Sequence, residues 1–250
     1  MKKIIFVFLI FFSLVLEAQN ANELFSNANN LYKNGEYSKA IELYSAIEKQ
    51  GLESDELFFN LGNSYYKLNK VAPSIYYYEK ALKINPSNED ALTNLSFAKR
   101  MTIDIIEDLP KTFLQRFSTN VIQKLSFDTW ATIAVVSSFL VAVLFLLYYF
   151  SFSSKKKLLY FNTTIFTAFV LIISVFFGYN NYKTVKNNKA AIIFVPKVEI
   201  KNAPSTNSDE VFVLHEGTKV IILDELDNWK KIKIADGKIG WIYADDLKEI

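Results

Sequence analysis

The sequence contains no cysteine and only one histidine, and these shortages remove several kinds of functional site. Without cysteine there is no structural disulfide, no thiolate nucleophile and no cysteine-based zinc or iron–sulfur centre. A catalytic triad or a histidine metal cluster would have to be built around the one ring of His215. This residue precedes a Glu-Gly turn, so we predict a surface residue beside that turn. The sequence predicts a protein that is not an enzyme, with no metal and no cofactor.

An excess of charge of one sign is also missing. The chain has 28 Lys and Arg against 26 Asp and Glu, a formal net charge of +2 over 250 residues. Nucleic-acid binding needs a concentrated basic face that neutralises phosphates. The near balance therefore predicts no nucleic-acid partner.

The apolar residues gather in three segments, of which the first covers residues 4–16. It follows a short basic start, Met1-Lys2-Lys3, and gives way to polar residues after Ala18. This order is typical of a secretory signal, so we predict a signal peptide over residues 1–18. Two alternatives stay open: an uncleaved anchor, because Leu16 is larger than the residue favoured there, and a buried N-terminal strand or helix.

The second and third apolar segments, residues 129–150 and 158–179, contain no charged residue. At a rise of about 1.5 Å per residue each is long enough to cross a hydrocarbon core of about 30 Å. Aromatic residues such as Trp130 and Tyr179 stand where an interfacial belt would hold the helix ends. The two segments therefore predict transmembrane helices joined by a loop over residues 151–157.

The expected loop carries three lysines and no acidic residue, which places it in the cytoplasm by the positive-inside rule. A translocated N-terminus followed by two spans leads independently to the same topology. We predict a protein of the inner (cytoplasmic) membrane with two spans, a short basic cytoplasmic loop, and both soluble regions in the periplasm.

The region before the spans repeats itself at a shift of 34 residues. Under this shift Ala28 aligns with Gly62 and Tyr44 with Tyr78. Small residues thus stand where two helices would touch, and large ones where they would fill the gaps. This pattern resembles the tetratricopeptide repeat, which implies a helical solenoid over residues 19–101.

The resemblance implies a concave face lined by fixed positions of the first helix in each repeat. These positions hold Phe25, Asn29, Tyr32, Lys33, Phe59, Asn60, Asn63, Tyr66, Lys67 and Asn94. Asparagine amides can pair with both the donor and the acceptor of an extended peptide backbone, which suits a peptide-binding groove. Phenylalanine stands where such proteins carry a lysine that clamps a peptide C-terminus, so we do not expect that mode. In the alternative interpretation the aromatic residues pack against the next repeat.

The linker over residues 102–128 contains a stretch, 111–125, with apolar residues on one side and polar residues on the other. This periodicity predicts an amphipathic helix. Such a helix lies either in the membrane interface or against the repeats, and the sequence leaves both open.

From residue 190 onward, short runs of β-branched and aromatic residues alternate with turn dipeptides such as Asp236-Gly237. The pattern predicts a small barrel of short strands. Together with the Gly240-Trp241 pair it resembles the bacterial SH3-like domain, here over residues 180–250. The resemblance implies a module that binds cell-wall peptide stems or proline-containing segments.

Three aromatic residues of this region, Trp229, Trp241 and Tyr243, are candidates for a ligand shelf. In the interpretation that we prefer, Trp229 and Trp241 instead fill the core of the barrel. The two interpretations differ in whether the indole rings face the core or the solvent.

In order, the segments predict a multi-domain protein: an all-α tetratricopeptide helical repeat, a transmembrane α-helical hairpin and a small all-β SH3-like barrel. This order resembles the E-protein family of the Bacteroides aerotolerance operon. The resemblance implies a Bacteroidetes-type inner-membrane protein that works beside von Willebrand-type membrane proteins and an AAA-type ATPase, in aerotolerance or envelope stress.

Two functions follow as hypotheses. In the first, the protein is a non-enzymatic scaffold or adaptor that binds envelope or membrane proteins, such as the von Willebrand-type proteins, through its repeats. In the second, it is a sensor of the cell wall that binds peptidoglycan through its SH3-like domain.

Overall fold

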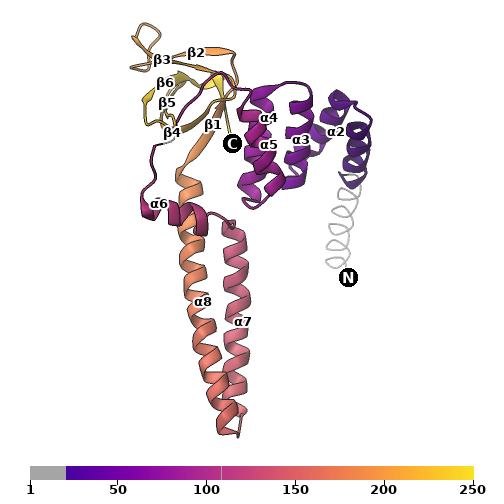
Figure 1. Ribbon diagram of the computed structural model, residues 1–250, viewed down its shortest axis with the longest axis vertical. Coiled ribbons are helices and arrows are strands. Elements are labelled where there is room, and N and C mark those ends of the chain that lie inside the picture. The colour runs from indigo at the N-terminus through magenta and orange to yellow at the C-terminus, as the bar shows by residue number, and fades with distance from the viewer. Residues whose placement is uncertain (1–20, 108) are drawn as a thin grey trace, which may run out of the picture. The chain divides into compact units, whose positions relative to one another are not determined.

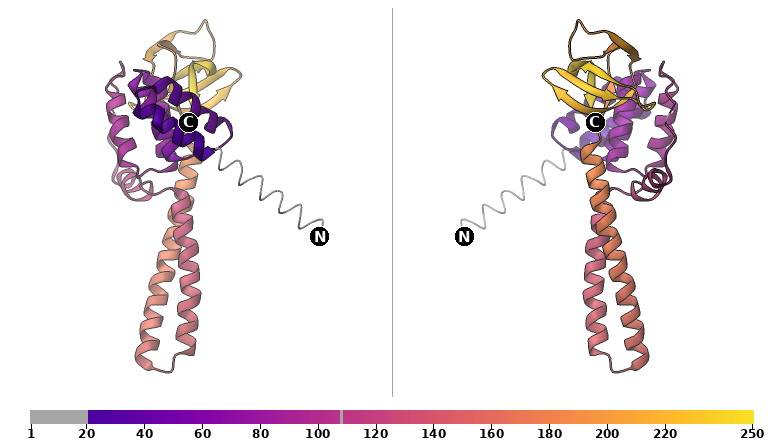
Figure 2. Two further views of the ribbon diagram at one scale, coloured as in Figure 1. Left: turned by 90° about the vertical axis from the view of Figure 1, so that its right-hand side faces the viewer. Right: turned by 90° about the vertical axis from the view of Figure 1, so that its left-hand side faces the viewer.

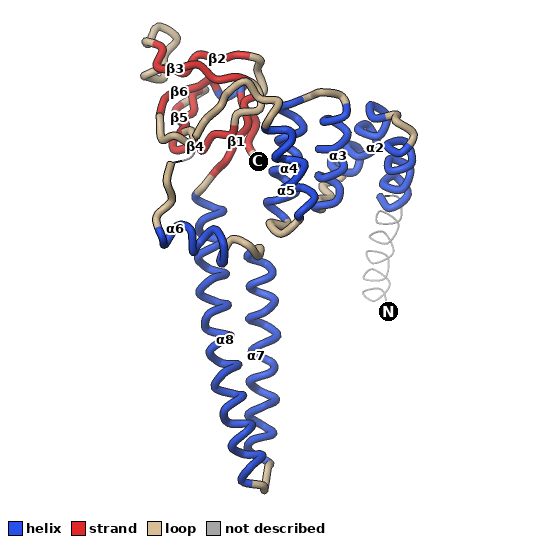
Figure 3. Tube along the Cα trace, viewed as in Figure 1, coloured by secondary structure: helices blue, strands red, loops and turns tan. Residues whose placement is uncertain are grey.

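The computed structural model describes residues 21–107 and 109–250, so the expected signal peptide lies outside the described residues. The chain divides into two compact units (Figure 1). One combines the N-terminal helices with the C-terminal strands, and the other is formed chiefly by Leu109–Lys189. The predicted fold class is confirmed, since helical repeats, two long apolar helices and an antiparallel β-sheet follow one another along the chain (Figure 3).

The N-terminal helices, here called the repeat module, are short and follow one another through tight turns. After a helix over residues 21–33 come α2 (Tyr37–Lys49), α3 (Asp55–Lys67), α4 (Val71–Ile84) and α5 (Glu89–Lys99). Ser54 and Asn88 cap α3 and α5, because each side-chain oxygen accepts a hydrogen bond from the backbone N–H three residues later. Acidic residues in the first turns and lysines in the last turns complement the helix dipoles.

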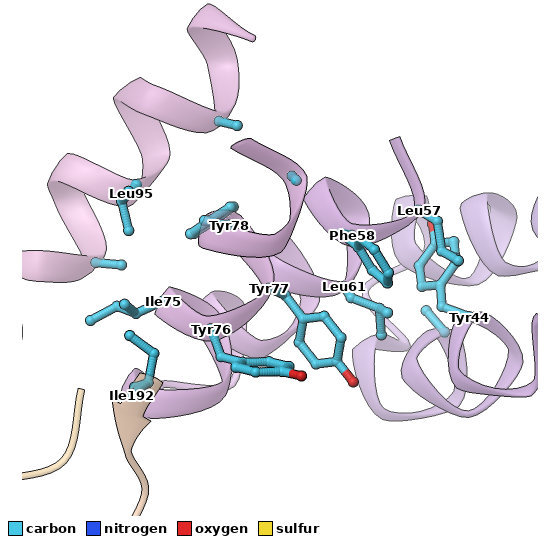
Figure 4. Close-up of a cluster of buried hydrophobic side chains, with 14 of the residues drawn as sticks. Tyr44, Leu57, Phe58, Leu61, Ile75, Tyr76, Tyr77, Tyr78, Leu95 and Ile192 are labelled. Carbon is cyan, nitrogen blue, oxygen red and sulfur yellow. The ribbon is translucent and has the colours of Figure 1, made fainter. Parts of the chain in front are cut away.

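Large side chains packed on small ones hold the repeat module together. Ala28, Tyr44 and Tyr78 are fully buried. Gly62 lies so close to the ring of Tyr78 that a Cβ atom on it would be 2.6 Å from Cδ1 of that ring. Figure 4 shows part of the resulting cluster, which includes Phe58. Both aligned pairs of the 34-residue shift therefore lie in the interior of the repeats.

Two long helices, α7 (Phe127–Phe150) and α8 (Ser154–Asn187), are long and apolar enough to span a membrane. Their most apolar windows have mean hydropathies of 2.5 and 2.0, and only 6% of each window is buried. A core helix of a soluble protein with this composition would bury most of its surface. Their exposure therefore fits helices whose apolar surface faces lipid.

The connection between these helices is shorter than the expected loop over residues 151–157. Only residues 151–153 are non-helical, and the three lysines that follow belong to the first turn of α8. At its other end α8 continues past residue 179 to Asn187. No proline interrupts residues 154–187, so hydrogen bonding carries the helix beyond the apolar stretch.

The linker forms two short helices instead of the one amphipathic helix expected over residues 111–125. These are α6 (Phe113–Phe117) and the π-helix η1 (Ser118–Ile122). The Nε1–H of Trp130 donates to the carbonyl oxygen of Ile122, and the Nδ2 of Asn181 donates to that of Leu125. These bonds fasten the linker to the hairpin.

The C-terminal strands, here called the β module, form one sheet in the order β3-β2-β6-β5-β4-β1-β7. The strands are β1 (Lys189–Ile193), β2 (Lys197–Lys201), β3 (Glu210–His215), β4 (Lys219–Leu226), β5 (Trp229–Lys233), β6 (Ile239–Tyr243) and β7 (Leu247–Glu249). Its core is mostly isoleucine, with Ile193, Ile200, Ile232 and Ile242 fully buried. β-Branched side chains suit such a pleated, buried face.

The repeat module and the β module belong to one compact unit and touch along α4. Ile192 of β1 belongs to the hydrophobic core of the repeats. The ring of Phe194 meets that of Tyr76 edge to face, with centroids 5.7 Å apart. Gly217, in the turn before β4, would place a Cβ atom 3.1 Å from Cδ1 of Ile75. The two modules are therefore closely packed.

His215 precedes the Glu216-Gly217 turn as expected, but it is only partly exposed because it takes part in this interface. One carboxylate oxygen of Asp104 accepts hydrogen bonds from the backbone N–H of His215 at 2.7 Å and from Oγ1 of Thr218 at 2.6 Å. The other lies 2.7 Å from Nδ1 of His215. Burial acts to raise the pKa of Asp104, but the hydrogen bonds from Thr218 and His215 outweigh it and keep the pKa low.

A second buried carboxylate, Glu79 of α4, joins the modules through ion pairs. Its oxygens lie 2.6 Å from Nζ of Lys219 in the β module and 3.2 Å from Nζ of Lys99 in α5. Burial acts to raise the pKa of Glu79, but the two lysines outweigh it and lower the pKa. Removing one partner would leave a charge buried without full compensation, so this network penalises separation of the modules.

The packing of the turn at Gly217 can be tested with Gly217→Ala, using Gly35→Ala as a matched control. Both glycines have a positive φ, 87° and 81°, but nothing lies within 4 Å of a Cβ at Gly35. In both variants an alanine must adopt the left-handed backbone conformation, which destabilises the protein by about 1–2 kcal/mol. Only Gly217→Ala also presses on Thr102, Val71 and Ile75, so we expect a further loss of about 1–3 kcal/mol. Chemical unfolding of the full-length protein in mild detergent measures both, and equal losses would contradict the docking of this turn.

Candidate functional site

A pocket of about 200 Å³ opens on the repeat module. It is lined by Tyr32, Asn63, Tyr66, Lys67, Asn94 and Phe97. Five of these, Tyr32, Asn63, Tyr66, Lys67 and Asn94, are among the residues that the sequence placed in a groove. The pocket therefore gathers side chains from three successive first helices of the repeats.

The other predicted groove residues, among them Phe25, Asn29, Phe59 and Asn60, do not line this pocket. Asn29 and Asn60 hydrogen-bond to each other in the preceding repeat. Phe25 and Phe59 are half-buried and contact the buried tyrosines, with ring centroids 5.7 Å from Tyr44 and 6.1 Å from Tyr78. Each ring therefore packs against the second helix of its own repeat.

A hydrogen-bonded triad of asparagine, tyrosine and asparagine recurs at the 34-residue shift. In the second copy Oδ1 of Asn63 accepts from the hydroxyl of Tyr78 at 2.7 Å and from Nδ2 of Asn94 at 2.8 Å. In the first copy Oδ1 of Asn29 accepts from the hydroxyl of Tyr44 at 2.5 Å and from Nδ2 of Asn60 at 3.1 Å. The same contacts thus orient the asparagines of both copies.

The tyrosine hydroxyls are held in the donating state. Burial raises the pKa of Tyr44 to about 12 and also raises the pKa of Tyr78. Both hydroxyls therefore keep their protons at neutral pH and donate to the asparagine oxygens. We did not predict this role for the tyrosines, although their recurrence at the repeat shift is visible in the sequence.

The triad leaves one donor and one acceptor for a ligand. The Oδ1 of Asn63 already accepts two hydrogen bonds. The Nδ2 of Asn63 has no hydrogen-bond partner among residues 21–107 and 109–250. The Oδ1 of Asn94 is likewise without a donor in this described part. An amide N–H group and a carbonyl group next to each other in the pocket match what an extended peptide backbone offers.

The charge around the pocket is positive. Lys67 lines it, and the guanidinium of Arg100 lies 5.3 Å from the ring centroid of Phe97, another lining residue. No acidic side chain of the described residues lines the pocket. Sequence reasoning missed Phe97, which stands one shift after Asn63 and breaks the asparagine pattern at that position. The pocket therefore combines amide groups, aromatic surface and positive charge.

The three aromatic candidates of the β module lie on the outer face of its sheet. Trp229 pairs with Tyr243 across the β5–β6 ladder, and their rings meet edge to face at 5.4 Å. Trp241 pairs with Lys231, whose Nζ lies 5.9 Å from the ring centroid. The alternating residues Ile232 and Ile242 fill the core instead. The preferred interpretation of Trp229 and Trp241 as core residues is therefore wrong.

Comparison with known protein families agrees with the folds of the repeat module and the β module. Residues 56–88 match the family model of the tetratricopeptide repeat, and residues 197–248 match that of the bacterial SH3 domain. The chain contains a tetratricopeptide repeat and a bacterial SH3 domain. No curated protein matches the chain. Both domains are non-catalytic, and the repeat indicates a protein partner.

The first repeat lies outside the matched range, yet it has the same internal contacts. Asn29 and Tyr44 of the first repeat, together with Asn60 of α3, make the same contacts as Asn63, Tyr78 and Asn94. The bacterial SH3 domain includes the outward-facing Trp229, Trp241 and Tyr243. The chain thus presents two candidate binding surfaces, one on each domain.

The role of the tyrosine hydroxyl can be tested with Tyr78→Phe, using Tyr66→Phe as a control from the same pocket. Tyr78→Phe removes the hydrogen bond to Asn63, so we expect a loss of about 1 kcal/mol in the free energy of unfolding. The hydroxyl of Tyr66 donates no hydrogen bond to another described residue, so its removal should leave stability unchanged. Chemical unfolding of the full-length variants measures both. If the two variants lost the same stability, the triad would have no special role.

Proposed function

We propose that this protein is a non-enzymatic membrane adaptor that binds an extended segment of an envelope protein in the pocket of its tetratricopeptide repeats. The observation that supports this proposal is the triad, which orients Asn63 and Asn94 and leaves the Nδ2 of one and the Oδ1 of the other open to a ligand. Main-chain hydrogen bonds supply affinity in this mode of recognition, and side-chain pockets supply specificity.

The surroundings of the pocket favour one class of segment. Its lining offers Lys67 and no carboxylate among the described residues, so an acidic group on the ligand would be attracted. Phe97 and Tyr66 offer aromatic surface for an apolar side chain. The adaptor therefore favours a segment that carries both acidic and apolar residues.

The proposed location is the inner membrane, with two spans. The lysines at the start of α8 favour a cytoplasmic position for the turn of the hairpin, and both soluble modules then lie in the periplasm. The order of modules resembles the E-protein family of the Bacteroides aerotolerance operon. We therefore propose von Willebrand-type membrane proteins as the partners, in an aerotolerance or envelope-stress complex.

A second function is supported by the outward-facing aromatic residues of the β module. Trp229, Trp241 and Tyr243 share one face of the sheet with Lys231. Outward-facing aromatic rings next to a cation form a surface on which a cell-wall peptide stem can stack and pair its carboxylate. In this alternative the protein is a sensor that binds peptidoglycan.

Two variants, each with a pair of substitutions, separate the two functions. Asn63→Ala with Asn94→Ala removes the open amides of the pocket, and Trp229→Ala with Trp241→Ala removes the aromatic face of the β module. We expect the first pair to abolish co-purification of the partner from crosslinked cells, because each lost peptide hydrogen bond weakens binding about tenfold. The second pair should leave that partner bound.

Binding of the full-length protein to purified cell-wall sacculi tests the sensor function directly. The adaptor function predicts no retention on sacculi for the wild type. Retention that is lost only in the tryptophan variant would favour the sensor instead. Circular dichroism of each variant checks that the repeats and the sheet remain folded. A partner retained by the asparagine variant would contradict the adaptor proposal.

The topology can be tested directly because the chain has no cysteine, so any introduced cysteine is unique. We expect Ser26→Cys and Thr206→Cys to react in intact cells with a maleimide that cannot cross the inner membrane. Ser153→Cys, in the turn of the hairpin, should react only after lysis. Labelling of Ser153→Cys before lysis would reverse the proposed orientation.

A further inference from the structure

A large pocket lies between α7 and α8 next to the turn that joins them. Its volume is about 650 Å³, within the usual range of small-molecule sites. Most of its wall is apolar and comes from Val143, Leu146, Leu147, Phe150 and Phe152. The polar groups at its lining are Ser151, Ser153, Lys156 and Tyr160.

The two ends of the hairpin differ in how closely the helices pack. Figure 2 shows the hairpin from two opposite sides, with the connecting turn at its lower end. At the opposite end, Gly178 would bring a Cβ within 3.2 Å of Cβ of Trp130, and Trp130 also packs on Phe177 with centroids 5.2 Å apart. The pocket is therefore a local opening at the end of the hairpin that carries the lysines.

The lysines at the turn of the hairpin carry positive charge that no acidic residue in the surrounding sequence balances. The sequence contains no Asp or Glu between Asp128 and Glu199. Lys155, Lys156 and Lys157 are exposed, and no carboxylate of residues 21–107 or 109–250 forms an ion pair with them. Lysines in the first turn also oppose the helix dipole, so they do not stabilise α8. An anionic group from outside the protein would therefore meet no competing carboxylate from residues 129–198.

We propose that this pocket binds one anionic phospholipid, with an acyl chain between α7 and α8 and its phosphate at Lys156. The apolar wall and the lysine charge together specify an amphiphile with an anionic head group. A soluble phosphate would leave the apolar wall exposed, and a neutral lipid would leave the lysines unpaired. A second copy of the chain would bring three more lysines to the same place and repel the first.

The experiment uses the full-length protein, purified in mild detergent and examined by native mass spectrometry with phosphatidylglycerol or phosphatidylcholine. We expect one bound phosphatidylglycerol and no comparable binding of phosphatidylcholine. Lys155→Gln with Lys156→Gln should weaken binding about fivefold for each lysine. The matched control, Lys183→Gln with Lys186→Gln, removes the same charge from the other end of α8 and should bind as the wild type does.

The apolar part of the site has its own pair of variants. Val143→Phe fills the pocket, whereas Val136→Phe adds the same side chain at an exposed position of α7 that does not line it. Only Val143→Phe should weaken the binding of phosphatidylglycerol. Several results would overturn the inference: equal binding of both lipids, equal losses in a variant and its control, displacement of the lipid by inorganic phosphate, or a dimer that forms in its place.

This inference rests on the proposed membrane insertion of the hairpin. Alkaline carbonate extraction of cell membranes distinguishes a failure of the insertion from a failure of the lipid site. A protein released by carbonate would overturn the insertion and the lipid site together. A protein that stays in the membrane but shows no preference for phosphatidylglycerol would overturn the lipid site alone.

Discussion

The burial of α4 on several sides is the constraint on which the larger unit of this protein depends. Eight residues of this helix are buried, among them three consecutive tyrosines, Tyr76, Tyr77 and Tyr78. A helix that is apolar over most of its circumference cannot face water and needs cover from more than one direction. The repeats cover it through Tyr78, and the β module covers it through the contact of Phe194 with Tyr76. The repeat module and the β module are therefore coupled by the same helix.

This coupling has a functional consequence. Tyr78 supports the asparagines of the pocket, and Glu79, its neighbour in α4, binds a lysine from each module. The outward-facing aromatic residues of the SH3 domain belong to the same compact unit as the pocket. A ligand that engaged both surfaces would therefore bind with a raised effective concentration at the second. Under the proposed function, a single compact unit of this kind is suited to holding an extended partner.

Much of the fold could be predicted because its signals are local and periodic. The 34-residue shift identifies the repeats, and the uncharged apolar segments identify the long helices. The same shift placed Asn63 and Asn94 in the groove, where the pocket contains both. It did not reveal Phe97, because that residue replaces an asparagine and so interrupts the pattern that was followed. The tryptophans were misplaced because alternation along a strand does not say which of its two faces is buried.

The sequence by itself determined the helical repeats, the two apolar helices and the strand-rich end, since each depends on residues close together in the chain. The tertiary structure alone decided how these parts meet. Asp104 and His215 are 111 positions apart, and nothing in either local pattern indicates their pairing. The outward direction of Trp229 was likewise decided by the isoleucines that fill the other face. Contacts between distant segments depend on which surfaces remain to be buried once the local elements have formed, and that choice is made only in three dimensions.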